Sequence, residues 1–386
     1  MAIFRRAAAA ALLVLAAPAA SRAIPAGDLP VVDAGLDALY RGDDLGAIAI
    51  FDDAHRRAPD DPVLSLGSAT ARWWRLENDF APVGGDEEKD FLAADRRAID
   101  DALRATRGAD RADAYLCLGA AYGLRGRLSA SRQRWLAAYL DGRRSYMAET
   151  RAVALDPNEY DAYLGLGAFD YYAATLSRLL RLFAFTAGSK QRGLAELELA
   201  KNGRFSGVAA RLLLVGIDWT FEKKPQEAWR ILEKLSARYP DSPTMRTMRM
   251  IGLFHLRDAE GLQREARDFL RLAEGGAPFY RPLDRAAGHY FLGLGEELAG
   301  RYEDALTEER AALALIPPGH RTRGVPMLFI GECEDLLGRR ADATASYRAA
   351  LKEAPFWGVP RYARYLIKHP FRAGANPLPG RNDELD

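Results

Sequence analysis

The sequence predicts an all-α fold, an irregular α-solenoid of about seven to eight helix–turn–helix pairs. Alanine, leucine, arginine and glutamate dominate it and β-branched residues are sparse, which favours helix nearly everywhere. A chain of 386 residues is long for one core, and its hydrophobic fraction of 49% indicates a folded chain built from several units. Small residues, aromatic residues and prolines also recur at fixed offsets, as expected of a repeat array.

Residues 1–23 have the three parts of a secretory signal peptide. They begin with a basic stretch that holds two arginines, continue with an apolar run over residues 7–17, and end in the small-x-small sequence from Ser21 to Ala23. A membrane anchor is the alternative, but the apolar run is shorter than the ~20 residues that span a bilayer. We therefore expect cleavage after Ala23 and export to the periplasm or cell envelope.

The charge balance gives no support for nucleic-acid binding. Loss of residues 1–23 takes away three arginines and no acidic residue, so the formal net charge changes from +1 to −2. Nucleic-acid-binding domains are instead basic, with clustered lysines and arginines. We expect no nucleic acid among the partners.

Only two cysteines occur, and both are predicted to be free. The repeat register described next places Cys117 and Cys333 several repeats apart. That separation exceeds the ~7 Å between Cα atoms that a disulfide can bridge. We interpret both as small, buried apolar residues.

One register of small, aromatic and proline residues recurs along the chain. It begins at a glycine and continues 12, 16, 19 and 24 residues later. Two copies carry the full pattern: Gly331, Ala343, Tyr347, Ala350, Pro355, and Gly35, Ala47, Phe51, Ala54, Pro59. Two further copies keep it in part: Gly293, Ala305, Glu309, Ala312, Pro317, and Gly216, Ala228, Leu232, Leu235, Pro240. The repetition predicts one structural unit used several times.

Each position of the register has a mechanical reason. The first glycine lies within one helix, where it lets the facing helix approach closely, and a second glycine seven residues later ends that helix because glycine tolerates the left-handed conformation. The alanine, aromatic and alanine positions share one face of the second helix, and the aromatic ring fills the gap that the small residues leave. Proline then stops the second helix. One unit is therefore two helices joined by a tight turn.

This pattern resembles the tetratricopeptide repeat family. "YLCLGAAY", residues 115–122, is the best match to the first helix of that repeat, and the resemblance covers about residues 28–358. The lead glycines are 36 to 49 residues apart, from Gly119 to Gly331, so the array is irregular compared with the family period of 34. The resemblance implies a protein that binds a protein or peptide partner along its concave face. Together with the signal-like residues 1–23, it identifies the chain as similar to exported bacterial tetratricopeptide repeat proteins.

The repeat pattern divides the mature chain into four parts. Residues 24–108 hold the N-terminal repeats with a loop insertion, "NDFAPVGGDEEKDF". Residues 109–206 hold central repeats with lengthened helices, and residues 207–358 hold the C-terminal repeats. Residues 359–386 are expected to form a capping helix and a flexible tail.

The sequence offers no recognisable catalytic or metal site. Its five histidines are scattered without metal-ligand spacing, and neither a nucleophile elbow nor a phosphate-binding loop is found. The acid pairs Glu308 with Glu309 and Glu332 with Glu334 are interpreted as solvated helix faces. We predict a non-enzymatic protein with no catalytic residues, no metal and no cofactor; an enzyme without a known motif stays open as the second alternative.

Two groups of residues are candidates for partner binding. Arg246 and Arg249 share one helical face that the register turns towards the inner groove, where some family members grip a carboxylate. A solvated arginine face is the alternative, because the asparagines of that clamp are missing. Tyr171 and Tyr172 are the other candidates, and Tyr171 is expected on the inner face.

The two tyrosines belong to residues 168–187, "AFDYYAATLSRLLRLFAFTA", which have about the length of a membrane span. Three charged residues make a span costly, so an amphipathic helix on a membrane surface and a long core helix are the two interpretations. The first would make the protein a membrane-associated scaffold that docks lipid or an outer-membrane complex through this segment. The preferred prediction is a scaffold of the cell envelope that binds a protein or peptide in its groove.

Overall fold

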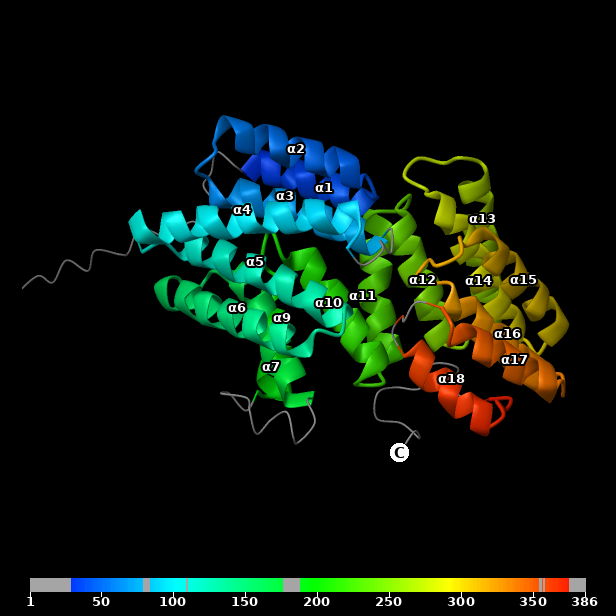
Figure 1. Cartoon of the computed structure of the whole chain (residues 1–386). Coiled ribbons are helices and arrows are strands. Elements are labelled where there is room, and N and C mark those ends of the chain that lie inside the picture. The colour runs from blue at the N-terminus through cyan, green and yellow to red at the C-terminus, as the bar shows by residue number, and fades with distance from the viewer. Residues whose placement is uncertain are drawn as a thin grey trace, which may run out of the picture.

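The computed structural model describes residues 29–78, 84–108, 110–175, 188–353, 356 and 358–374, and Figure 1 shows their arrangement. The predicted signal peptide lies outside the described residues, as does the second part of the apolar segment 168–187. The described residues form seventeen α-helices and one short 3₁₀-helix, without a strand. The all-α prediction is confirmed.

Sixteen of the helices form eight consecutive pairs, which agrees with the predicted seven to eight. The first four pairs are α1 (Leu29–Arg41) with α2 (Asp44–Arg57), α3 (Pro62–Asn78) with α4 (Asp86–Gly108), α5 (Ala112–Ser131) with α6 (Trp135–Leu155), and α7 (Tyr163–Thr175) with α9 (Lys190–Ala200). The next four are α10 (Gly207–Thr220) with α11 (Pro225–Arg238), α12 (Pro243–His255) with α13 (Ala259–Glu274), α14 (Pro282–Leu298) with α15 (Tyr302–Leu315), and α16 (Gly324–Leu336) with α17 (Arg340–Ala350). The 3₁₀-helix (Tyr160–Ala162) precedes α7, and α18 (Val359–Lys368) follows the last pair.

The predicted register is seen directly in the packing of the pairs. A Cβ atom on Gly35 would collide with the ring of Phe51, and one on Gly331 would collide with the ring of Tyr347. Both rings are fully buried. The glycine is therefore needed where the aromatic side chain of the second helix crosses the first helix.

The helix-ending glycines and the free cysteines also follow the predictions. Gly42, Gly300 and Gly338 have φ angles of 101°, 77° and 74°, so each adopts the left-handed conformation at the end of a first helix. Cys117 and Cys333 are free and buried.

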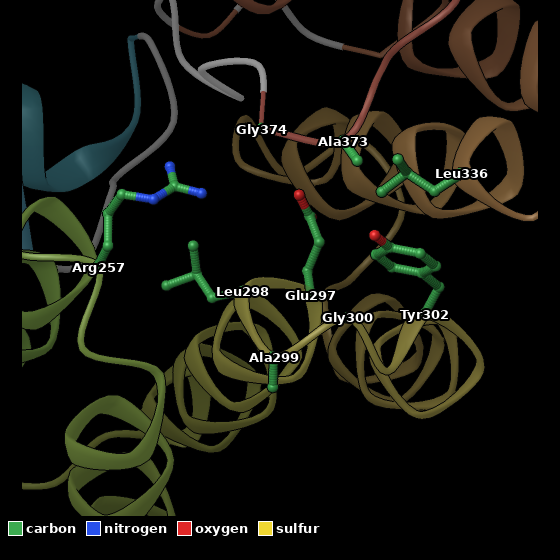
Figure 2. A pocket seen from close by; sticks show the side chains of 9 residues that line it. All are labelled: Arg257, Glu297, Leu298, Ala299, Gly300, Tyr302, Leu336, Ala373 and Gly374. Atoms are coloured by element: carbon green, nitrogen blue, oxygen red, sulfur yellow. The ribbon is translucent and has the colours of Figure 1, made fainter.

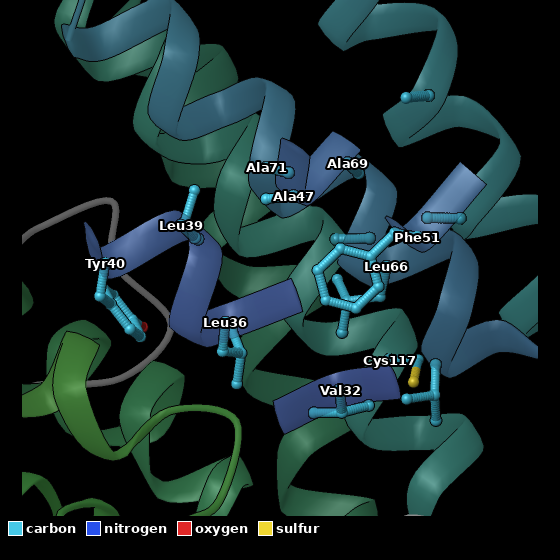
Figure 3. Close-up of a cluster of buried hydrophobic side chains, with 14 of the residues drawn as sticks. Val32, Leu36, Leu39, Tyr40, Ala47, Phe51, Leu66, Ala69, Ala71 and Cys117 are labelled. Atoms are coloured by element: carbon cyan, nitrogen blue, oxygen red, sulfur yellow. The ribbon is translucent and has the colours of Figure 1, made fainter. Parts of the chain in front are cut away.

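The N-terminal pair closes back onto the middle of the solenoid. Figure 3 shows Val32 and Leu36 of α1 in the N-terminal hydrophobic core. α1 packs against α12, and the same core includes Tyr239 and Met245 from the later repeats. The rings of Tyr40 and Tyr239 lie 5.8 Å apart. Segments separated by some 200 residues thus share one hydrophobic core.

Two ion pairs reinforce this closure at its edges. Arg204, from the turn before α10, donates a hydrogen bond of 2.9 Å to Asp33 of α1. Arg281, just before α14, pairs with Asp44 of α2, whose side chain is buried. The first pair therefore contacts both its neighbour in sequence and the later repeats.

Candidate partner-binding site

The first helices of the early pairs form one continuous surface, which we call the inner face. α1 contacts α3, α3 contacts α5 and α5 contacts α7. The guanidinium group of Arg127 on α5 lies 5.0 Å from the ring centroid of Trp73 on α3, and its charge also reaches the hydroxyl groups of Tyr40 on α1 and Tyr172 on α7. Arg127 of α5 therefore lies near aromatic residues of three other first helices, α1, α3 and α7.

Arg127 is exposed and not neutralised. Among the residues that the structure describes, none forms an ion pair or a hydrogen bond with its guanidinium group. Burial raises the pKa values of Tyr40 and Tyr172, and the positive charge of Arg127 opposes both shifts. The inner face thus presents a free cation beside aromatic rings.

Only one of the two candidate tyrosines is available at the surface. Tyr171 is fully buried among Leu197, Leu214 and Ile217, and its hydroxyl group donates a hydrogen bond to Glu222. The expectation that Tyr171 is exposed on the inner face is therefore wrong. Adjacent residues lie about 100° apart around a helix, and it is Tyr172, 38% exposed, that remains accessible.

Arg246 and Arg249 are directed at neighbouring helices instead of lying free on the inner face. Both pair with Glu265 of α13, at 2.9 Å and 3.5 Å, and Arg249 also stacks 5.2 Å from the ring centroid of Trp229 on α11. Their side chains stay 23% and 30% exposed. Two cations share one carboxylate, so the group keeps a net positive charge that a partner can contact.

A small pocket lies at the other end of the solenoid, at the ends of α14 and α16. Its volume is about 260 Å³, and Figure 2 shows the Glu297 carboxylate pointing into the space between Arg257 and Tyr302. Burial raises the pKa of Glu297 to about 7, and the charge of Arg257 opposes the rise. The lining residues include no serine, cysteine or histidine, and Glu297 and Tyr302 are the titratable groups that face Arg257 across the pocket.

A glutamate, Glu309, occupies the aromatic position of the register that begins at Gly293, and Glu149 of α6 makes the same kind of contact with the glycines of α5 and α7. A Cβ on Gly119 or Gly165 would collide with Glu149, and a Cβ on Gly293 would lie 2.8 Å from Glu309. Both glutamates are buried, as the aromatic ring would be. These carboxyl groups therefore fill space between helices instead of facing solvent.

The interpretation of two acid pairs as solvated helix faces is wrong for their buried members. Within the described ranges of the chain, Glu309 and Glu332 have no hydrogen-bond partner for either carboxylate oxygen, and Glu334 is also buried. Burial, followed by the negative charges of neighbouring glutamates, raises the pKa values of Glu309 and Glu332 well above the usual range. Burial therefore favours the neutral form of both carboxyl groups in the folded protein.

Sequence reasoning missed Arg127 because an arginine on an amphipathic helix has no signal of its own. The detectable signal was its place, eight residues after Gly119 on a first helix, together with the tryptophans at Trp73 and Trp74 on the preceding one. No group of acidic, histidine or cysteine side chains able to hold a metal ion is found in the described part of the chain. None of the helices described is long and apolar enough to cross a membrane.

The paired helices and the glycine contacts define the class of fold: the described residues form an α-solenoid of helix–turn–helix pairs, whose register resembles that of tetratricopeptide repeats. No model of a protein family matches the chain, and no curated protein matches it. Solved structures that are similar include yeast Tom70, with 9% identity, a TM-score of 0.44, and coverage of 88% of this chain and 87% of that chain. The human IFIT1 dimer with m7Gppp-AAAA has 13% identity, a TM-score of 0.43, and coverage of 90% and 88%.

A tetratricopeptide repeat protein from Parabacteroides merdae is also similar, with 12% identity, a TM-score of 0.31, and coverage of 88% of this chain and 98% of that chain. TM-scores below 0.5 at such low identities transfer no partner and no activity from these proteins.

Proposed function

We propose that the protein is a non-enzymatic scaffold of the cell envelope that binds a protein or peptide partner on its inner face. The observation that carries this proposal is Arg127, an exposed cation that has no ion pair with any residue the structure describes and that lies against Trp73 and close to Tyr172. Arginine and large aromatic residues dominate the binding energy of protein interfaces. Export, which rests on the signal-like residues 1–23, places the scaffold in the periplasm or cell envelope.

The chemistry of the inner face favours a partner with a carboxylate group. A guanidinium group donates paired hydrogen bonds to a carboxylate, and its stacking on a tryptophan fixes its orientation beforehand. Tyr172 adds an aromatic surface with a polar end beside it. We propose Arg246 and Arg249 as a second, separate contact, because their shared carboxylate leaves one positive charge.

Substitution of the inner-face residues should weaken partner binding without unfolding the protein. With a partner recovered by cross-linking in the native envelope, we expect Arg127→Ala to lower the affinity ~10- to 100-fold and Tyr172→Ala ~10-fold, because each removes a contact at a site of concentrated binding energy. Titration calorimetry with the purified partner measures the affinity. Arg246→Ala combined with Arg249→Ala should weaken binding by a similar factor if the second contact is used.

Arg348→Ala is the control for these variants, since Arg348 is an exposed arginine on α17, far along the chain from the inner face. It should leave both affinity and melting temperature unchanged. Unchanged affinity of Arg127→Ala would instead remove the inner face from the binding site.

A second candidate function, membrane association, is favoured by an exposed apolar strip on α6. Leu136, Leu140 and Met147 are 73%, 43% and 60% exposed, and Trp135 at the start of the helix is half exposed. α6 packs on α7, where Phe169 contacts Tyr146 at a centroid distance of 4.9 Å, so the strip adjoins the beginning of segment 168–187. Exposed apolar residues on a helix with arginines at its edges are typical of an interfacial helix.

Vesicle flotation tests this second function. If the strip docks on a membrane, the wild-type protein should float with vesicles that contain anionic lipid, and Leu136→Glu combined with Met147→Glu should abolish flotation, because two charges cannot enter the acyl region. Leu45→Glu on α2 is the matched control, since Leu45 is 61% exposed and belongs to a different surface. Equal flotation of both variants and the wild type would rule out α6 as the membrane contact.

A further inference from the structure

The pocket at the ends of α14 and α16 holds two oppositely charged side chains that do not pair with each other. Arg257 and Glu297 both line it, and Figure 2 shows the guanidinium group and the carboxylate directed into the same space. Among the residues that the structure describes, neither group forms an ion pair or a side-chain hydrogen bond. Both groups are therefore available to a ligand.

The packing of three helices sets the separation of the two groups. Arg257 lies in the turn between α12 and α13 and has a φ angle of 56°, the left-handed conformation that Gly300 and Gly338 adopt after α14 and α16. Glu297 belongs to the last turn of α14, which packs against both α12 and α13. The backbones on both sides of the pocket are thus held by neighbouring helices.

The remaining lining residues leave room for a small molecule with an apolar part. Leu298 and Leu336 supply apolar surface, Gly300 and Gly374 have no side chain to fill the space, and Tyr302 adds an aromatic ring (Figure 2). The volume of about 260 Å³ lies below the range of about 300–1,000 Å³ that is typical of clefts for drug-sized ligands. The pocket is accordingly too small for a folded partner or a long peptide.

A ligand that carries both charges would satisfy both groups at once. A guanidinium group donates paired hydrogen bonds to a carboxylate, and a carboxylate accepts hydrogen bonds from an ammonium group. A ligand with only one charge leaves either Arg257 or Glu297 without a partner. The opposite charges beside two leucines therefore match the carboxylate, the ammonium group and the side chain of an apolar amino acid.

We propose that this pocket binds a free amino acid with an apolar side chain, its carboxylate on Arg257 and its ammonium group on Glu297. The site goes beyond the proposed partner binding, because it takes a small molecule and involves neither Arg127 nor Tyr172.

The ionisation of Glu297 makes this binding depend on pH. Burial raises the pKa of Glu297 to about 7, and the charge of Arg257 opposes the rise. The other titratable groups that interact with Glu297 come from its own helix and from the two helices that follow: Tyr290, Glu309, Glu332 and Cys333. An ammonium group pairs with the ionised carboxylate and not with the neutral acid, so the affinity should rise about tenfold between pH 6 and pH 8.

Titration calorimetry of the full chain with three matched probes tests the proposal. We expect L-leucine to bind in a saturable way. Isocaproate, which lacks the ammonium group, and isoamylamine, which lacks the carboxylate, should each bind at least tenfold more weakly. Arg257→Gln should remove the preference for leucine over isoamylamine. Glu297→Gln should remove the preference over isocaproate together with the pH dependence, because each variant deletes the partner of one ligand charge.

Two control variants delete exposed charges elsewhere. Arg348→Gln on α17 and Glu274→Gln at the end of α13 should leave the leucine affinity unchanged. Absence of saturable leucine binding, or equal affinities for the three probes, would overturn the proposal, and this comparison in the unaltered chain decides the matter even where a variant does not fold. Non-additive destabilisation by Arg257→Gln and Glu297→Gln without leucine binding would also overturn it, by showing that the two groups pair with each other in solution. Partner binding through Arg127 is measured separately and can succeed or fail on its own.

Discussion

Ala343→Arg should destabilise the protein by at least about 2 kcal/mol. Ala343 is fully buried on α17, in a core with Leu328, Tyr362 and Phe371, so an arginine there must either displace neighbouring helices or bury its charge. The neighbouring helices α16 and α18 would separate from α17. Urea or thermal unfolding followed by circular dichroism measures the loss.

The control is the adjacent residue. Asp342 is exposed, so Asp342→Arg should change the unfolding free energy by less than about 0.5 kcal/mol. Similar losses in the two variants would show that the repeat register on α17 is misplaced by one residue.

Glu309→Gln should stabilise the protein at neutral pH and do little near pH 4. The pKa of Glu309 is raised well above its usual value of 4.5 by burial and by the charges of Glu297 and Glu308. In the unfolded chain the same carboxyl group ionises near its usual pKa of 4.5. Between pH 4.5 and the raised pKa of the folded state, the unfolded state therefore binds fewer protons than the folded state. Stability then falls as pH rises, by at most about 1.4 kcal/mol per pH unit for one such group. Glutamine has nearly the same shape as glutamate and does not ionise. Glu309→Gln should therefore raise the free energy of unfolding by on the order of 2 kcal/mol at pH 7.

Unfolding curves at pH 4, 5.5 and 7 check both the sign and the range. The gain from Glu309→Gln should increase across this series, and Glu332→Gln should behave alike, because Glu332 is also fully buried without a hydrogen-bond partner. Glu260→Gln, at an exposed position at the start of α13, should change stability equally little at each pH. A gain for Glu309→Gln that is constant with pH would show that the carboxyl group finds a partner or reaches water.

The helix pairs could be predicted from the sequence because their contacts are local. Gly331 and Tyr347 meet across one tight turn, and their spacing repeats at Gly35 and Phe51, so a fixed offset carries the geometry. The closure of α1 on α12 has no such offset, since it joins residues about 200 positions apart through ordinary apolar side chains. Local periodicity contains no information on such a contact.

The candidate site was harder to predict for a related reason. A sequence pattern places Tyr171 and Tyr172 on a helix, but a rotation of a third of a turn decides which ring is buried. Likewise, the spacing of Arg246 and Arg249 indicates one shared face, while the acid they contact, Glu265, belongs to the next helix. The sequence therefore predicts which residues share a helical face, whereas the residues that this face contacts depend on how the helices pack.

The closure of the first pair onto α12 changes how cooperatively the array can unfold. In an open solenoid each repeat touches only its neighbours, so the terminal repeats fray first and unfolding spreads inwards. Here the N-terminal pair is anchored twice, through Asp33 to Arg204 and through Asp44 to Arg281. Detaching it exposes the core of α12 as well as its own, which couples the stability of distant repeats. The first six pairs therefore behave less like a row of independent units and more like one cooperative domain.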